Sequence, residues 1–337
     1  MKKNKISLGT EILNILLICL VNYIVMSKDS SSLFVNFVAS LVLAVTLCAS
    51  SSKKASFYTV FGVLMAFIIY CASFTFSDTA FIVNGVIRVA DLYLPAYVLQ
   101  LCFKSTKAKI GTTVYLVSGA NLLVTILDLA KIKYIDKINT AETLEASIGD
   151  MIEDYMAVID TNAVFKDIGA ERINELFDSV CKITVMLLPA FYIISCIIIS
   201  YIFIISVRGM LKVYLKEEHE HIEHFYQISV GRMFSNITLI LILLAMISGN
   251  SYFTAAVYNF AVIAGFIYLI NGIAVVYFLM IKKTRNKYAG LILTIALMIF
   301  SVISVVTMPS INGFTIMFLI GLLDSSVNFR KLKRVGE

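Results

Sequence analysis

The stretch TAAVYNFAVIAGFIYLINGIAVVYFLM, residues 254–280, decides the fold class because it contains no charged residue over its whole length. A helix needs about 20 predominantly apolar residues to cross the hydrocarbon core of a bilayer. Lipid offers no hydrogen-bond partner to exposed backbone groups, so a segment of this kind crosses as an α-helix. The stretch therefore predicts a transmembrane helix.

The rest of the chain repeats this pattern. Of its 337 residues, 59% are hydrophobic and only 15% are charged, whereas about a quarter are charged in a soluble protein. Soluble enzyme folds are thereby excluded. Ten apolar segments qualify as spans: 10–26, 32–50, 55–76, 80–103, 110–128, 179–206, 236–249, 254–280, 288–307 and 312–327.

The number of spans depends on two short segments. Residues 236–249 and 312–327 are short enough to be tilted, re-entrant or packed inside the bundle. We therefore expect an all-α, polytopic helix bundle with about eight to ten spans.

The basic residues predict the orientation. Most of the 28 Lys and Arg residues cluster at alternate ends of the predicted spans, and cytoplasmic loops are the ones enriched in these residues. This pattern predicts a multi-pass protein of the cytoplasmic membrane with both termini cytoplasmic. The formal charge of +6 then reflects topology and gives no reason to expect a nucleic-acid partner.

One long polar segment divides the chain into three parts. Residues 129–178 are rich in Asp and Glu, and we expect them to form an acidic extracytoplasmic helical segment between N-terminal helices in 1–128 and C-terminal helices in 179–337. Asn139 and Glu142 have the spacing of a capping box, which predicts that an amphipathic helix begins there. The segment could be a cap over the outer ends of the spans, a lid over a cavity, or a docking surface.

Ionisable residues at membrane depth are candidates for function, because a charge in lipid is costly unless it is paired or hydrated. Arg88 and Asp91 lie three residues apart in the fourth predicted span, so one helix face brings them together. They could form an ion pair that stabilises the bundle. Alternatively, Arg88 could hold an anionic ligand, with Asn84, Asp91 and Tyr93 as its neighbours.

All three histidines fall in the stretch EEHEHIEH. On a helix Glu217, His221 and His224 share a face, and imidazole with carboxylate could bind a divalent cation. A solvated charged helix explains the stretch equally simply, and the HExxH pattern is absent. We expect no cofactor.

The C-terminal third carries a set of residues that resembles a known family. An Asn-Gly pair in a span is followed by a basic turn, a last hairpin and a closing Gly-x-x-Asp and Phe-Arg-Lys. This arrangement is similar to the YybS-like family of bacterial multi-pass membrane proteins. The matching residues are Asn271, Gly272, Gly321, Asp324, Phe329, Arg330 and Lys331.

The resemblance implies a bacterial membrane protein of a family that has no established activity and whose members are often encoded beside a membrane-bound cyclic-dinucleotide phosphodiesterase. Our leading hypothesis is a non-enzymatic small-molecule-binding or transport-related membrane subunit. The alternative is a scaffold or regulatory partner of a membrane signalling protein such as that phosphodiesterase. An intramembrane enzyme acting on lipids would require carboxylates converging near an interface.

Overall fold

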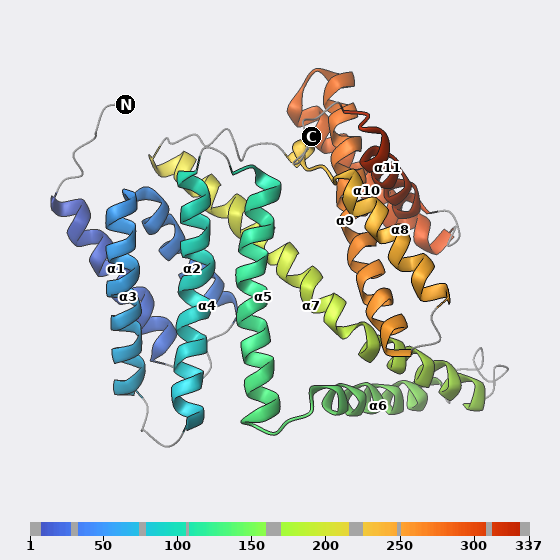
Figure 1. Cartoon of the computed structure of the whole chain (residues 1–337), viewed down its shortest axis with the longest axis horizontal. Helices are drawn as coiled ribbons and strands as arrows, with labels where there is room; N and C mark the ends of the chain where they lie inside the picture. The colour runs from blue at the N-terminus through green and yellow to red at the C-terminus, as the bar shows by residue number, and fades with distance from the viewer. Residues whose placement is uncertain are drawn as a thin grey trace. The chain divides into compact units, whose positions relative to one another are not determined.

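The computed structural model describes residues 8–27, 33–73, 79–105, 108–159, 170–215, 225–247, 251–307 and 312–330, and its regular elements there are all helices (Figure 1). The elements are α1 (Leu8–Met26), α2 (Leu33–Ala49), α3 (Ser52–Ser73), α4 (Thr79–Lys104), α5 (Ile110–Tyr134), α6 (Thr140–Ile159), α7 (Ala170–Leu215), the 3-10 turn η2 (Phe225–Gln227), α8 (Arg232–Ile247), α9 (Ser251–Thr284), α10 (Lys287–Thr307) and α11 (Gly313–Val327).

The predicted all-α, polytopic membrane fold is confirmed. Seven helices in the described ranges, α1, α3, α4, α5, α7, α9 and α10, are long and apolar enough to cross a membrane. Three further apolar helices are shorter. Two of them, α8 and α11, correspond to the segments that the sequence marks as short, and α2 is the third.

The chain forms two compact units. The first contains Met1–Val158 and Ser195–Ile222, and the second contains Ile159–Ile194 and Glu223–Glu337. The single helix α7 contributes its N-terminal half to the second unit and its C-terminal half to the first. Its 46 residues extend well beyond the predicted span 179–206 at both ends.

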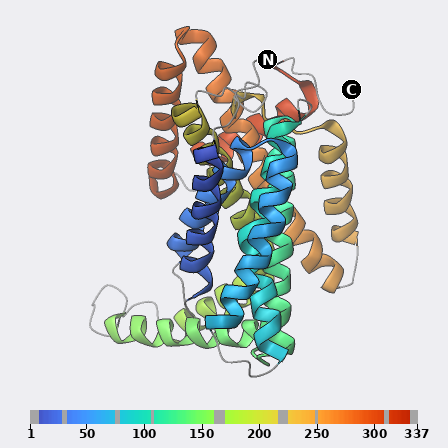
Figure 2. The ribbon, with the colours of Figure 1, turned by 90° about the vertical axis from the view of Figure 1, so that its left-hand side faces the viewer.

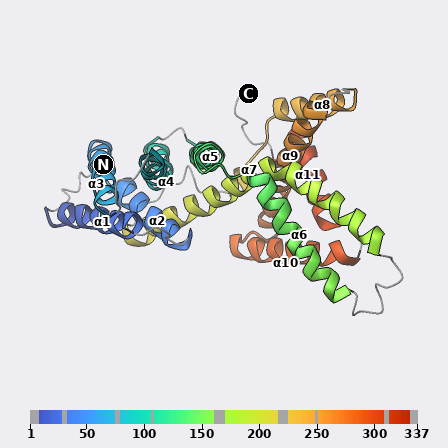
Figure 3. The ribbon, with the colours of Figure 1, turned by 90° about the horizontal axis from the view of Figure 1, so that it is seen from below.

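The first unit has two layers. Helices α3, α4 and α5 stand in a row, seen end-on in Figure 3, with α4 packed against both neighbours. Helices α1 and α2 form the other layer and pack against α3 and α4 respectively. The second half of α7 joins this unit through Phe203, which contacts Phe37 edge to ring, and through Ser200, which accepts a hydrogen bond of 2.7 Å from Asn121 Nδ2.

The amphipathic helix expected in the polar segment is α6. Asn139 caps it as predicted: its Oδ1 accepts a hydrogen bond from the Ala141 N–H (3.2 Å), and its Nδ2 donates to Glu142 Oε1 (2.7 Å). Figure 2 shows α6 running crosswise to α4 and α5. Leu144 and Ile148 are half-buried, whereas the acidic residues between Glu142 and Asp150 are exposed.

The second unit is built around α9, which packs against α8, α10, α11 and η2. Tyr268 of α9 is its central side chain and lies about 6 Å, between ring centroids, from Phe234 of α8 and Phe318 of α11. Its hydroxyl donates to Ser235 Oγ at 3.1 Å. Aromatic packing and one satisfied hydroxyl thus stabilise the centre of the unit.

An asparagine side chain of α9 forms hydrogen bonds with backbone groups of α7 next to Pro189. Asn259 of α9 accepts a hydrogen bond from the Ala190 N–H (3.0 Å) and donates one to the Met186 carbonyl (2.7 Å). These are the two backbone groups that an i to i−4 bond would otherwise join. Asn259 therefore satisfies the backbone of a helix next to its proline.

Candidate functional site

The four residues predicted to surround an anionic ligand lie on two faces of α4. Asn84, Arg88 and Asp91 follow at intervals of four and three, which places them on one face. Tyr93 comes nine residues after Asn84 and therefore lies on the opposite face. The ligand-binding role of this set stays a prediction.

Arg88 contacts an aromatic ring of the neighbouring helix. Its guanidinium lies 5.7 Å from the centroid of the Tyr70 ring. The same ring stacks on Phe81 at 4.8 Å and covers Gly85, where a Cβ would lie 2.7 Å from the ring. Asp91, in contrast, is exposed. Arg88 thus takes part in the packing of α4 against α3, through a cation–π contact.

Tyr93 is a core residue of the first unit. It is 3% exposed, and its hydroxyl donates a 2.8 Å hydrogen bond to Asn22 Oδ1 on α1. Asn22 Nδ2 in turn donates to the carbonyl oxygen of Gly62 on α3 at 2.9 Å. We call Asn22, Gly62 and Tyr93 the neutral triad, because it joins three helices without a charged group.

A groove lies between α3 and α4, with a volume of about 460 Å³. Its lining is apolar except for hydroxyl groups, and Arg88 is not part of it. Of the four residues predicted to surround an anionic ligand, Tyr93 lines this groove, whereas Asn84, Arg88 and Asp91 do not.

Most of the residues that carry the family resemblance meet in the second unit. Gly272 of α9 and Gly321 of α11 face each other where the helices cross. A Cβ on Gly272 would overlap the carbonyl oxygen of Met317, and one on Gly321 would overlap that of Tyr268. Glycine is therefore required at both positions for the backbones to approach this closely.

A buried ion pair lies beside this crossing. Arg330 Nη2 donates to Asp324 Oδ2 and to Asn271 Oδ1, each at 2.7 Å, and Nη1 donates to the carbonyl oxygen of Tyr226. Asn271 Nδ2 donates to the Gly321 carbonyl oxygen at 2.8 Å. Asn271, Asp324 and Arg330 are each at most 5% exposed. We call Asn271, Gly321, Asp324 and Arg330 the charged cluster.

The left-handed residue Asn328 allows Arg330 to reach this position. Asn328 ends α11 with φ 55° and ψ 57°, and its N–H bonds to the Asp324 carbonyl oxygen. The chain reverses there, as in a helix C-cap, and Arg330 returns to the level of Asp324. Of the two remaining residues of the signature, Phe329 is exposed and Lys331 lies outside the described residues.

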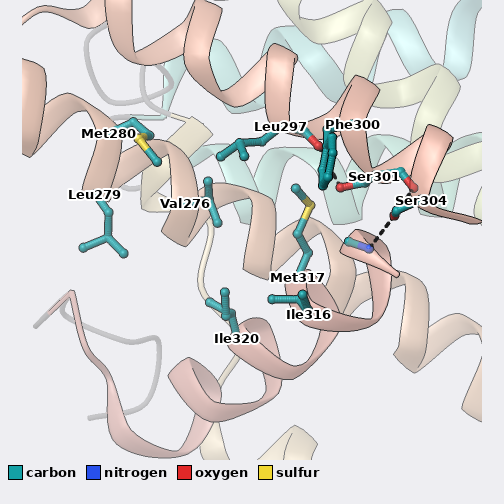
Figure 4. A pocket seen from close by; sticks show the side chains of 11 residues that line it. Val276, Leu279, Met280, Leu297, Phe300, Ser301, Ser304, Ile316, Met317 and Ile320 are labelled. Carbon is teal, nitrogen blue, oxygen red and sulfur yellow. Dashed lines mark hydrogen bonds between the residues drawn. The ribbon is translucent and has the colours of Figure 1, made fainter. Parts of the chain in front are cut away.

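The second unit also contains a groove. Its volume of about 560 Å³ is larger than that of the groove between α3 and α4. The larger groove is lined by residues of α9, α10 and α11 (Figure 4). Val276, Leu279 and Met280 come from α9, Leu297, Phe300, Ser301 and Ser304 from α10, and Gly313, Ile316, Met317 and Ile320 from α11.

The only hydroxyl groups in this groove are already bonded within the protein. Ser301 Oγ donates to the Leu297 carbonyl (2.7 Å), and Ser304 Oγ donates to the Ser301 carbonyl (2.8 Å). Ser304 Oγ also accepts from the Gly313 N–H at 2.9 Å. The groove therefore offers a ligand mainly aliphatic and aromatic surface, which suits an apolar molecule.

Sequence reasoning missed this groove, although α10 carries a signal for it. The buried residues of α10 in the described range are all small or hydroxylated: Gly290, Thr294, Ser301 and Ser304. Their spacing places them on one face, while large side chains on the opposite face, such as Ile292 and Ile299, are exposed. A helix with small residues facing its neighbours leaves little to fill the space where the helices diverge.

The structure gives no view of the histidine-rich stretch, because Glu217, His221 and His224 lie outside the described residues. Elsewhere, in the ranges that are described, no group of three or more His, Cys, Asp or Glu side chains could hold a metal ion.

Comparison with known proteins identifies a family. A family model described as "Predicted membrane protein (DUF2232)" matches residues 16–325. No curated protein and no solved structure matches the chain. The match extends over both units, from α1 to α11.

Proposed function

The chain belongs to the DUF2232 family of predicted membrane proteins, and on this premise we propose that it is a non-enzymatic membrane subunit that binds a small apolar molecule. The observation that carries the proposal is the groove between α9, α10 and α11. We call it the C-terminal groove.

Three features of the C-terminal groove support binding. Its volume of about 560 Å³ falls within the range of small-molecule sites, about 300–1,000 Å³. Its lining is apolar, and its two serine hydroxyls are bonded to backbone groups of α10. A polar ligand would therefore lose its hydration without gaining partners, whereas a hydrocarbon chain would lose nothing.

The test is native mass spectrometry of the protein extracted in mild detergent, comparing wild type with Ile320→Trp and Leu319→Trp. Ile320 lines the groove, while Leu319 is its exposed neighbour on the same helix and does not. We expect wild type and Leu319→Trp to retain a low-mass apolar adduct and Ile320→Trp to lose it. Retention by wild type and by both variants would contradict binding in the groove.

Transport is a finer proposal that rests on this one. A subunit that binds a small apolar molecule could transfer it to a partner protein. Such a partner would appear in the same mass spectra as a co-purifying protein. A stoichiometric protein partner with no adduct in wild type would instead favour the alternative, a scaffold for a membrane signalling protein.

We also propose the orientation from the basic residues. Lys53, Lys54, Lys104 and the turn 282–287 would face the cytoplasm of a bacterial cell, as the enrichment of Lys and Arg in cytoplasmic loops predicts. Cysteine labelling from either side of the membrane at exposed Lys53 (Lys53→Cys) and at the exposed end of α6 (Glu145→Cys) tests this. Labelling of both from the same side would overturn it. The closer likeness to the YybS-like family stays a prediction.

A further inference from the structure

The turn between α9 and α10 gathers positive charge. Lys282, Lys283, Arg285 and Lys287 are all exposed. The backbone of the turn is well defined: Arg285 is left-handed (φ 55°) and donates its N–H to the Ile281 carbonyl, and Asn286 Oδ1 accepts from the Tyr288 N–H at 2.9 Å. Four cations are thus held within six residues.

The nearby sequence supplies no acid to neutralise this turn. Residues 225–323 contain no Asp or Glu. The next acidic residue, Asp324, is buried and bonded to Arg330. Among the described residues from 225 to 330, the positive charge of the turn therefore has no exposed acidic counterpart.

One of these cations continues the groove-lining face of α9. Val276, Leu279 and Met280 line the C-terminal groove, and Lys283 follows at the next helical interval on the same face. It lies three residues beyond Met280, a rise of about 4.5 Å along the helix. Lys282 points about 100° away from Lys283 around the helix axis, so it is off this face.

From this juxtaposition we propose that the C-terminal groove and Lys283 form one site for an anionic phospholipid. An acyl chain lies along Val276, Phe300 and Ile316, and the phosphodiester headgroup is bound by Lys283 with help from the other cations of the turn. The inference rests on the proposed function and names its ligand class.

The combination of an apolar groove and a basic end favours a phospholipid over other ligands. A free phosphate would use the turn but not the groove, and a neutral hydrocarbon would use the groove but not the turn. A lysine can lay its aliphatic stem along the apolar lining while its ammonium group stays at headgroup level. Basic clusters beside membrane helices attract anionic lipids in this way.

The experiment measures lipid retention by native mass spectrometry, using phosphatidylglycerol and phosphatidylcholine with identical acyl chains as probes. Wild type is compared with Lys283→Gln, with Lys282→Gln as the matched charge control, and with Ile320→Trp as the groove variant. Size-exclusion profiles and thermal unfolding in the same detergent verify that each variant is folded.

We expect wild type to retain phosphatidylglycerol over phosphatidylcholine. Lys283→Gln should lower retention of phosphatidylglycerol about fivefold, the factor that corresponds to one basic residue near an anionic surface, and leave phosphatidylcholine unchanged. Lys282→Gln should have less than half of that effect. Ile320→Trp should lower retention of both lipids.

Two results would overturn the inference while leaving the proposed function intact: equal retention of the two lipids by wild type, or equal effects of Lys282→Gln and Lys283→Gln. Retention of inorganic phosphate by wild type that is lost in Lys283→Gln, with no retention of phosphatidylglycerol, would also overturn it, because the turn would then bind phosphate without a chain. If Ile320→Trp retains both lipids as wild type does, the groove itself is not the site and the proposed function fails as well.

Discussion

The two units contain the same type of contact between helices, but it involves only neutral groups in the first unit and a buried ion pair in the second. In each, an asparagine amide donates a hydrogen bond to the carbonyl oxygen of a glycine on another helix: Asn22 to Gly62 in the first unit and Asn271 to Gly321 in the second. The amide oxygen then accepts from a third group. This group is the neutral hydroxyl of Tyr93 in one case and the guanidinium of Arg330 in the other.

This difference predicts how strongly substitutions of the polar residues destabilise each unit. Removing a member of the neutral triad leaves a polar atom without its partner, whereas removing one member of the ion pair in the charged cluster leaves a buried charge. The second is much more costly in a low-dielectric interior. The second unit should therefore be more sensitive to single substitutions at its polar residues than the first.

The largest expected effect is that of Arg330→Met. It leaves the Asp324 carboxylate, which is 1% exposed, without its cation, and we expect a loss of about 3–5 kcal/mol in the free energy of unfolding. Thermal or denaturant unfolding in mild detergent measures it. The double variant Arg330→Met/Asp324→Leu removes both charges and should recover most of the loss. A single variant as stable as wild type would contradict a structural role for the pair.

The next largest effects on stability are expected for substitutions of Gly321 and Gly62. Gly321→Ala places a methyl group against the backbone oxygen of Tyr268, so the helices must separate, and we expect a cost of about 1–3 kcal/mol. Gly62→Ala meets the end of the Tyr93 side chain instead, which can shift, so it should cost less. Unfolding midpoints of the two variants, measured side by side, check the order. The reverse order would show that the first unit has the tighter crossing.

Tyr93→Phe should have a smaller effect. It removes one neutral hydrogen bond and keeps the ring, and interhelical hydrogen bonds of this kind contribute about 0.6 kcal/mol on average in membrane proteins. Asn22→Leu, which also frees the Gly62 carbonyl, serves as the comparison and should cost more. A loss for Tyr93→Phe as large as that for Arg330→Met would end the distinction between the neutral triad and the charged cluster.

Arg88→Leu is expected to have an effect on stability about as small as that of Tyr93→Phe. It removes a cation–π contact with Tyr70, and such contacts contribute about 0.5–1 kcal/mol at accessible sites. Adduct retention in native mass spectra should not change. Loss of a bound low-mass anion in this variant would instead support the ligand-binding role that the sequence suggests for Arg88.

The elements of the fold could be predicted from the sequence because each span has to be apolar along its own length. The segments 110–128 and 288–307 begin at or within one residue of α5 and α10, and the Asn139 cap of α6 was predictable from a local pattern. The ends of α7 could not be predicted in this way, because polar turns continue the helix beyond its apolar run. The hydrophobic composition of a segment shows which of its residues can lie in lipid, but it does not show at which residue the helix ends.

The contacts between helices could be predicted only in part. The residues of the resemblance named Asn271, Gly321, Asp324 and Arg330, and the structure brings them together. The partnership of Tyr93 with Asn22, 71 residues away, could not be derived, because helical periodicity gives the face of a residue and not its neighbour. The C-terminal groove was missed for the same reason: it exists only where three helices diverge.

The most direct measurement is an experimental structure of the protein in lipid nanodiscs containing phosphatidylglycerol. An elongated density should run along Val276, Phe300 and Ile316 and end at Lys283, beside the intact Asp324–Arg330 pair. A C-terminal groove that is closed by its own side chains, or empty under these conditions, would contradict lipid binding by this unit.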